Sequence, residues 1–123
     1  MSRHETIVRL RHMVSHASEA VELLGEKTPE ALADDRVLSL ALVRLLEVVG
    51  EAANRIPRDV QAQYPRIPWS QIISLRNRVI HGYDSVDLDI VWVIITQDLP
   101  LLINALNGIL DDLETGPHDA SRA

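Results

Sequence analysis

Apolar residues recur every three or four positions along most of the chain, a spacing typical of amphipathic helices. The first stripe ends at Gly25, and glycine commonly closes a helix; its members are Ile7, Leu10, Val14, Ala17, Val21 and Leu24. The second stripe follows Asp34 and Asp35, either of which can cap a helix; its members are Leu38, Leu42, Leu45, Val49, Ala52 and Ile56. The pattern predicts two long helices, separated by a break at Thr28 and Pro29.

The second predicted helix also carries apolar residues away from its main stripe: Val37, Leu40, Ala41, Leu46 and Val48. A helix that is apolar on more than one side must bury more than one side. The covering surface can come from the same small domain or from a second subunit, and the pattern alone leaves both open.

Prolines divide the middle of the chain. Pro57 can open a short helical turn, because proline is tolerated in the first turn of a helix. Pro68 stands where it can start a third helix, which we predict from Trp69 to about Ile80. Gly82 then follows as the residue that stops this helix.

A last helix is predicted from Leu88 to about Leu113, with a kink at Pro100 because proline lacks the amide for one backbone bond. No strand alternation or repeat competes with the helical pattern. The 123 residues fit one domain. We therefore predict an all-α fold, an antiparallel bundle of four main helices plus a short helix. It forms a single domain over residues 1–114, and residues 115–123 are expected to be a disordered polar tail.

Composition narrows the possible chemistry and location. The chain has no cysteine, which removes thiolate catalysis and zinc–thiolate sites. Two histidines, His12 and His16, have a metal-ligand spacing, but no carboxylate between them completes a metalloprotease-type set, so no metal site is predicted. The N-terminus enters mixed charges directly, and the longest apolar runs, such as residues 90–95, are shorter than a membrane span. We expect a cytoplasmic protein with no membrane partner.

Charge is distributed unevenly. The net charge of −6 argues against broad coating of nucleic acid. Between residues 55 and 81, however, five arginines stand against one acidic residue, Asp59. A local basic patch on an acidic protein suits a confined phosphate-binding site; the alternative is that some of these arginines only cover a surface.

Residues 76–84 combine polar groups that are unusual in a structural turn: Arg76, Asn77, Arg78, His81 and Tyr83. Residues five apart on a helix are rotated by about 140°, at about 100° per residue, so Arg76 and His81 would not share a face. Their convergence requires the helix to loosen before His81, or a second copy of the site across a symmetric dimer.

Arginine and histidine without a metal cluster form a suitable set for RNA cleavage. The RNA 2′-hydroxyl can act as the nucleophile, the histidine can move protons, and the guanidinium can bind the phosphate and its transition-state charge. The product would be a 2′,3′-cyclic phosphate. The competing interpretation is a histidine that caps carbonyls at a helix C-terminus, with arginines beside it doing the same.

The string Arg76-x4-His81-x-Tyr83 resembles the R-x4-6-H signature of HEPN ribonucleases, in the form with a following tyrosine found in HepT-like toxins. Three further segments resemble that family in the same order along the chain. Residues 46–57 resemble its second helix, residues 64–69 its lead-in to the active-site helix, and residues 86–100 its last helix. The resemblance covers most of the chain, from about residue 3 to residue 113.

The resemblance implies a homodimeric, metal-independent endoribonuclease that acts as the toxin of a toxin–antitoxin pair. Arg76 and His81 are then the catalytic residues at a dimer cleft, supported by Asn77 and Arg78, with RNA as substrate and no cofactor. A minimal nucleotidyltransferase antitoxin would adenylylate Tyr83 and silence the enzyme. The alternative is a non-catalytic HEPN module that binds a nucleotidyltransferase partner or a nucleotide.

Two acidic residues on the second predicted helix, Glu47 and Glu51, complete the candidate site. They lie four residues apart and therefore on one face. They can form an acid pair, or they can orient the motif arginines by ion pairing. We expect the second, because they interrupt an otherwise apolar helix near the proposed interface.

Overall fold

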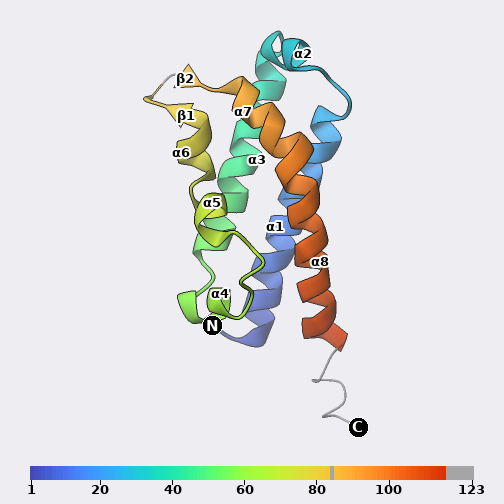
Figure 1. Cartoon of the computed structure of the whole chain (residues 1–123), viewed down its shortest axis with the longest axis vertical. Coiled ribbons are helices and arrows are strands. Elements are labelled where there is room, and N and C mark those ends of the chain that lie inside the picture. Colours follow the sequence, from blue (N-terminus) through green and yellow to red (C-terminus); the bar gives the residue numbers. More distant parts are fainter. Residues whose placement is uncertain (84, 116–123) are drawn as a thin grey trace.

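The computed structural model describes residues 1–83 and 85–115, and it is almost entirely helical, which confirms the all-α prediction (Figure 1). Three long helices make the bundle: α1 (Arg3–Leu24), α3 (Arg36–Asn54) and α8 (Leu99–Thr115). Shorter helical segments connect them: α2 (Pro29–Ala33), α4 (Arg58–Ala62), α5 (Trp69–Ile73), α6 (Leu75–Val79), α7 (Leu88–Val93) and the π-helical turn η1 (Ile94–Asp98).

The first half of the chain folds as its local signals predict. Helix α1 ends at Gly25, whose φ of 56° lies in the left-handed region that glycine tolerates. Helix α3 starts after Asp35, whose carboxylate accepts a hydrogen bond from the Leu38 amide at 3.0 Å. The short helix α2 was not predicted; Thr28 caps it by accepting a hydrogen bond from the Ala31 amide.

The third predicted helix is wrong in one respect, because it is broken at Ser74 into α5 and α6. It ends at Val79, close to the predicted Ile80, but the backbone leaves the helix at Ile80, before Gly82. The chain then forms two short antiparallel strands, β1 (Ile80–His81) and β2 (Ser85–Val86), although no strand was predicted. Two-residue strands are too short to produce a recognisable alternation.

The last predicted helix begins at Leu88 as expected, but the disturbance near Pro100 is a π-helical turn. The Leu99 amide reaches back to the Ile94 carbonyl, five residues earlier. This wider turn lies directly before proline, where a regular bond from residue 100 is impossible. Thr115, which the sequence placed in the tail, is the last residue of α8, and residues 116–123 lie outside the described part of the chain.

The run Leu88–Thr115 is long and apolar enough to cross a membrane by length and composition alone. A core helix of a soluble protein passes the same test, so this is weak support for a membrane span. Its buried side chains belong to the common hydrophobic core: Val91, Ile94, Ile95, Leu99, Leu102, Leu106 and Leu110. We therefore assign the run to the core of the bundle.

Gly50 allows a very close approach between α3 and α5. A Cβ atom at this position would lie 2.9 Å from the carbonyl oxygen of Ile72 and 3.4 Å from that of Ile73. Because α6 follows α5 after a single break, the position of α6 on the bundle depends on this contact.

The apolar residues away from the main stripe of α3 divide into two groups. Leu46 is fully buried, and Ala41 and Val48 are half-buried. Val37 and Leu40 remain 79% and 55% exposed. The bundle therefore covers only part of this second side.

Candidate functional site

The polar motif lies at one end of the bundle, where α6 leads into the β1–β2 hairpin (Figure 1). Arg76 belongs to α6, whereas His81 lies on β1, two residues beyond the end of the helix. The backbone is already extended at Ile80, with φ −109° and ψ 122°. The loosening of the helix before His81, which the spacing required for convergence in a single chain, is therefore present.

Arg76 faces α3. Its Nε lies 3.8 Å from a carboxylate oxygen of Glu47, whose side chain is 22% exposed. The same carboxylate lies 3.9 Å from Arg44, and Arg44 also approaches Glu51 at 3.6 Å. Glu47 thus lies between the guanidinium groups of Arg44 and Arg76. Glu51 forms its ion pair with Arg44, which is outside the motif.

His81 faces the start of α7. Its Nε2 lies 3.9 Å from the Asp87 carboxylate, and its side chain is 58% exposed. The other carboxylate oxygen of Asp87 accepts a hydrogen bond from the Ile90 amide at 3.0 Å and so caps α7. The Asp87 amide donates to the Val79 carbonyl at 2.8 Å, where α6 ends.

Arg76 and His81 have their ion-pair partners on different elements. Arg76 and Asn77 line a shallow hollow with residues of α3, among them Glu47, Glu51 and Asn54. His81 pairs with Asp87 at the start of α7. Among the residues that the structure describes, no hydrogen bond or ion pair joins Arg76 to His81.

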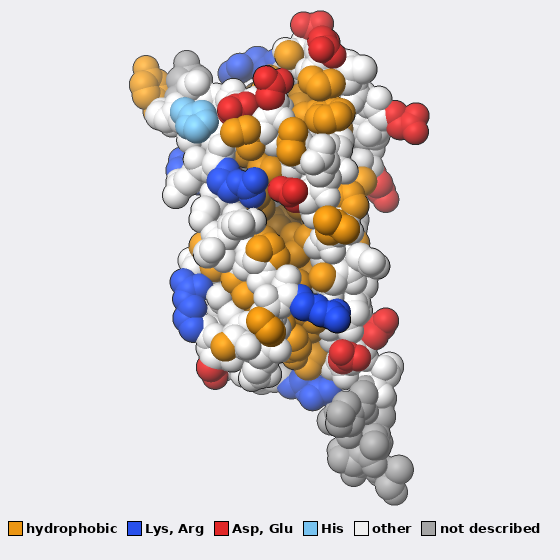
Figure 2. All heavy atoms as spheres, viewed as in Figure 1, with side chains coloured by type: hydrophobic (Ala, Val, Ile, Leu, Met, Phe, Trp, Pro, Cys, Tyr) orange, Lys and Arg blue, Asp and Glu red, His pale blue; other side chains and the backbone are white. Residues whose placement is uncertain are grey.

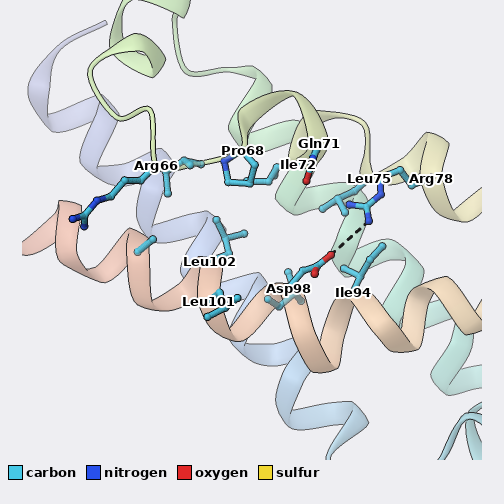
Figure 3. A pocket seen from close by; sticks show the side chains of 13 residues that line it. Arg66, Pro68, Gln71, Ile72, Leu75, Arg78, Ile94, Asp98, Leu101 and Leu102 are labelled. Atoms are coloured by element: carbon cyan, nitrogen blue, oxygen red, sulfur yellow. Dashed lines mark ion pairs between the residues drawn. The ribbon is translucent and has the colours of Figure 1, made fainter.

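Arg78 is directed toward the π-helical turn. Its guanidinium lies 3.5 Å from the Asp98 carboxylate, and this ion pair crosses from α6 to η1 (Figure 3). Beside the pair is a hollow of about 280 Å³ between α5–α6 and η1–α8. Its lining is mostly apolar, with Ile72, Leu102 and similar side chains, and Arg66 stands at its far end (Figure 3).

Figure 2 shows apolar side chains running down the middle of this face, with cationic and acidic side chains around them. The apolar hollow offers few partners for a phosphate backbone, so it does not suit RNA cleavage. Among the described residues, Arg78 is the one polar group of the motif that lines this hollow, whereas Arg76, Asn77, His81 and Tyr83 lie outside its lining.

Tyr83 lies in the turn of the hairpin and is fully exposed. Gly82 precedes it with a φ of 75°, a conformation that a residue with a side chain rarely adopts. Apart from its two chain neighbours, no described residue lies within 4 Å of where a Cβ atom at residue 82 would be. The tyrosine hydroxyl is therefore open to approach by another protein.

Sequence reasoning anticipated Glu47 as an ion-pair partner of a motif arginine, but it missed the partners of Arg78 and His81. None of Arg44, Asp87 and Asp98 was predicted as an ion-pair partner at the candidate site. Asp87 is six positions from His81 in sequence, and it meets the histidine only because the chain turns at Gly82 and pairs β1 with β2. A histidine, a glycine turn and an aspartate cap in succession were the only sequence signal of this contact.

Comparison with known proteins gives a consistent result. The family model described as Ribonuclease HepT-like matches residues 13–109. A protein of Thermococcus cleftensis named as a probable ribonuclease HepT is 36% identical over 69% of this chain and 81% of its own length. A candidate RNase of Methanocaldococcus jannaschii is 28% identical over 93% of this chain and 98% of its own.

A candidate RNase of Caldanaerobacter subterraneus subsp. tengcongensis is 31% identical, over 82% of this chain and 90% of its own length. No solved structure matches the chain. The matched residues 13–109 include α3, α6, the hairpin and α7, the elements that carry the motif and its partners.

Proposed function

The chain belongs to the HepT-like ribonuclease family and is an endoribonuclease, and from this premise we propose that it cleaves RNA with Arg76 and His81, without a metal ion, as the toxin of a toxin–antitoxin pair. The observation that carries the proposal is the placement of His81. The side chain stands exposed on β1, just past the end of the helix that carries Arg76, and a carboxylate faces its ring.

The cleavage step needs only these side chains and the RNA itself. The 2′-hydroxyl gives its proton to His81, and its oxygen forms a bond to the adjacent phosphorus. The bond from phosphorus to the 5′-oxygen breaks, and that oxygen takes up the proton from the His81 imidazolium, which returns the histidine to its neutral form. Arg76 binds the non-bridging oxygens and balances the extra negative charge of the transition state. The products are a 2′,3′-cyclic phosphate and a 5′-hydroxyl.

A homodimer is part of this proposal. Within one chain, the ion-pair partner of Arg76 lies on α3 and that of His81 lies at the start of α7. In a cleft between two copies, an arginine and a histidine could both reach the same RNA phosphate. The exposed Val37 and Leu40 lie near the start of α3, at the same end of the bundle as the hairpin (Figure 1). Light scattering at micromolar concentration should give twice the chain mass, and Leu40→Asp should reduce it.

The proposed control is adenylylation of Tyr83 by a nucleotidyltransferase antitoxin. Full exposure at the hairpin turn supports access by a modifying enzyme. An added AMP would place bulk and a phosphate two residues from His81, blocking RNA and competing for the arginines. Intact-mass measurement after incubation with ATP, magnesium and the partner should show added AMP. The gain should vanish in Tyr83→Phe and persist in Tyr64→Phe, the half-buried tyrosine that serves as control.

Cleavage of a short fluorescent RNA tests the enzymatic core. His81→Ala and Arg76→Ala should abolish cleavage, while the exposed controls His12→Ala and Arg11→Ala should retain it. Cleavage should survive EDTA and leave 2′,3′-cyclic phosphate ends. Parental cleavage by His81→Ala, or dependence on added metal, would contradict the mechanism. Loss of all cleavage in the parent, with binding of the nucleotidyltransferase intact, would favour a non-catalytic binding module.

A further inference from the structure

Asp87 connects three structural elements at the candidate site. One carboxylate oxygen caps α7 through the Ile90 amide, and the backbone amide binds the Val79 carbonyl at the end of α6. The second carboxylate oxygen faces His81 Nε2 at 3.9 Å. The Asp87 side chain is 34% exposed. The two hydrogen bonds hold the residue to α6 and α7.

We propose that Asp87 is a positioning residue for His81, holding the imidazole through Nε2 and leaving Nδ1 to take the proton of the RNA 2′-hydroxyl. This rests on the proposed ribonuclease function and names a further residue of the same site. An imidazole that donates one nitrogen's proton to a carboxylate keeps the other nitrogen as the acceptor.

The distance of 3.9 Å between His81 Nε2 and the Asp87 carboxylate fits a contact that shortens when substrate binds. It exceeds a hydrogen bond by about 1 Å, and catalytic hydrogen bonds are often long in the absence of substrate. The exposed ring of His81 can turn by this amount, whereas Asp87 cannot, because it is bonded to α6 and α7. The aspartate is the fixed partner and the histidine the movable one.

Among the residues that the structure describes, Asp87 is the one charged group that forms an ion pair with His81. Arg78 and Asp89 line a hollow with Asp87 in front of α7. Arg78 is paired with Asp98, and Arg76 with Glu47. The strand opposite His81 contributes only Ser85 and Val86, which carry no charge.

The chain contains a matched control for this proposal. Asp35 caps α3 as Asp87 caps α7, and each carboxylate accepts from the amide three residues later at 3.0 Å. Serine is also a good N-cap, so Asp87→Ser and Asp35→Ser both keep a cap. Only Asp87→Ser removes the oxygen that faces the histidine.

The kinetics of RNA cleavage by the full-length protein should distinguish Asp87→Ser from Asp35→Ser. In Asp87→Ser we expect kcat to fall about ten- to a hundredfold, the cost of a misplaced catalytic group, with KM changed less than about twofold. Asp35→Ser should keep both constants within about twofold. Asp87→Glu, which restores the carboxylate on a poorer cap, should recover part of kcat. Equal effects of the two serine variants, a loss confined to KM, or no recovery with glutamate would overturn the proposal.

A second readout does not depend on activity. Nuclear magnetic resonance of the imidazole nitrogens, with His81→Ala to assign the signals, reports the surroundings of the ring directly. The His81 signals should move in Asp87→Ser and stay unchanged in Asp35→Ser. Unmoved signals in Asp87→Ser would overturn the contact itself. A parent that does not cleave RNA would instead defeat the proposed function.

Discussion

Replacing Gly50 by alanine tests how strongly the close contact between α3 and α5 constrains the motif helix. The added Cβ would lie 2.9 Å from the Ile72 carbonyl oxygen. Relaxing this to an ordinary contact needs a shift of about half an ångström. The obstacle is backbone and not the end of a flexible side chain, so α5 as a whole has to move.

Gly108 in α8 provides the matched control, because a Cβ there meets nothing within 4 Å. Both substitutions gain about 1 kcal/mol of helix propensity. Only Gly50→Ala adds the cost of overpacking, about 1–3 kcal/mol. Propensity cancels in the comparison, so we expect Gly50→Ala to be less stable than Gly108→Ala by about 1–3 kcal/mol. The expected difference in Tm is about 4 °C per kcal/mol.

Urea denaturation followed by circular dichroism measures this difference, with all proteins at one concentration because dimerisation would shift the midpoint. RNA cleavage gives a second readout, since moving α5 also moves Arg76 on α6. Gly50→Ala should lose activity and Gly108→Ala should keep it. Equal or greater stability for Gly50→Ala would refute the argument, because it would mean that the contact with Ile72 relaxes at no cost.

Three further predictions concern stability. Leu106→Ala, at a fully buried position of α8, should lower the free energy of unfolding by about 2–5 kcal/mol, as measured by urea denaturation. A decrease below about 1 kcal/mol would contradict the place of Leu106 in the core. Asp98→Asn should cost less than about 1 kcal/mol, because its ion pair with Arg78 is 3.5 Å long and solvent-accessible; a double-mutant cycle with Arg78→Ala gives the coupling. Trp92→Phe removes the 2.9 Å hydrogen bond from the indole to the Lys27 carbonyl and should lower the unfolding free energy by about 0.5–1.5 kcal/mol, whereas an unchanged midpoint would show that water replaces the bond.

Elements with strong local signals were predictable from the sequence. The end of α1 at Gly25 and the cap of α3 at Asp35 depend on one residue each and its immediate neighbours. The apolar stripes correctly located α1 and α3, because burial of a whole helix face dominates helix stability in proteins.

The break at Ser74 and the hairpin depend on contacts between distant segments. Nothing in residues 69–79 forbids a continuous helix; the segment instead follows the surface of α3, where Gly50 admits the Ile72 backbone. The short strands are closed by the Asp87 amide reaching Val79. Such contacts leave no periodic pattern in the sequence.

The candidate site was also only partly predictable from the sequence. Arg76, His81 and Tyr83 could be chosen as candidates from the sequence, because polar residues gather there in one short segment. The direction of each side chain was not visible. Arg76 turns to α3 and His81 to α7, and this depends on where α6 ends and on the packing of its neighbours.

The β1–β2 hairpin has a ladder of only two residue pairs, Ile80 with Val86 and His81 with Ser85, and three of these four residues are exposed. The free energy needed to open so small a hairpin is far below the free energy of unfolding the whole domain. Its backbone amides should therefore exchange with deuterium much sooner than those in the buried turns of α3. The histidine of the motif thus stands on a segment that can be reshaped while the bundle stays folded, and slower exchange there would report directly on bound RNA or on an AMP attached at the turn.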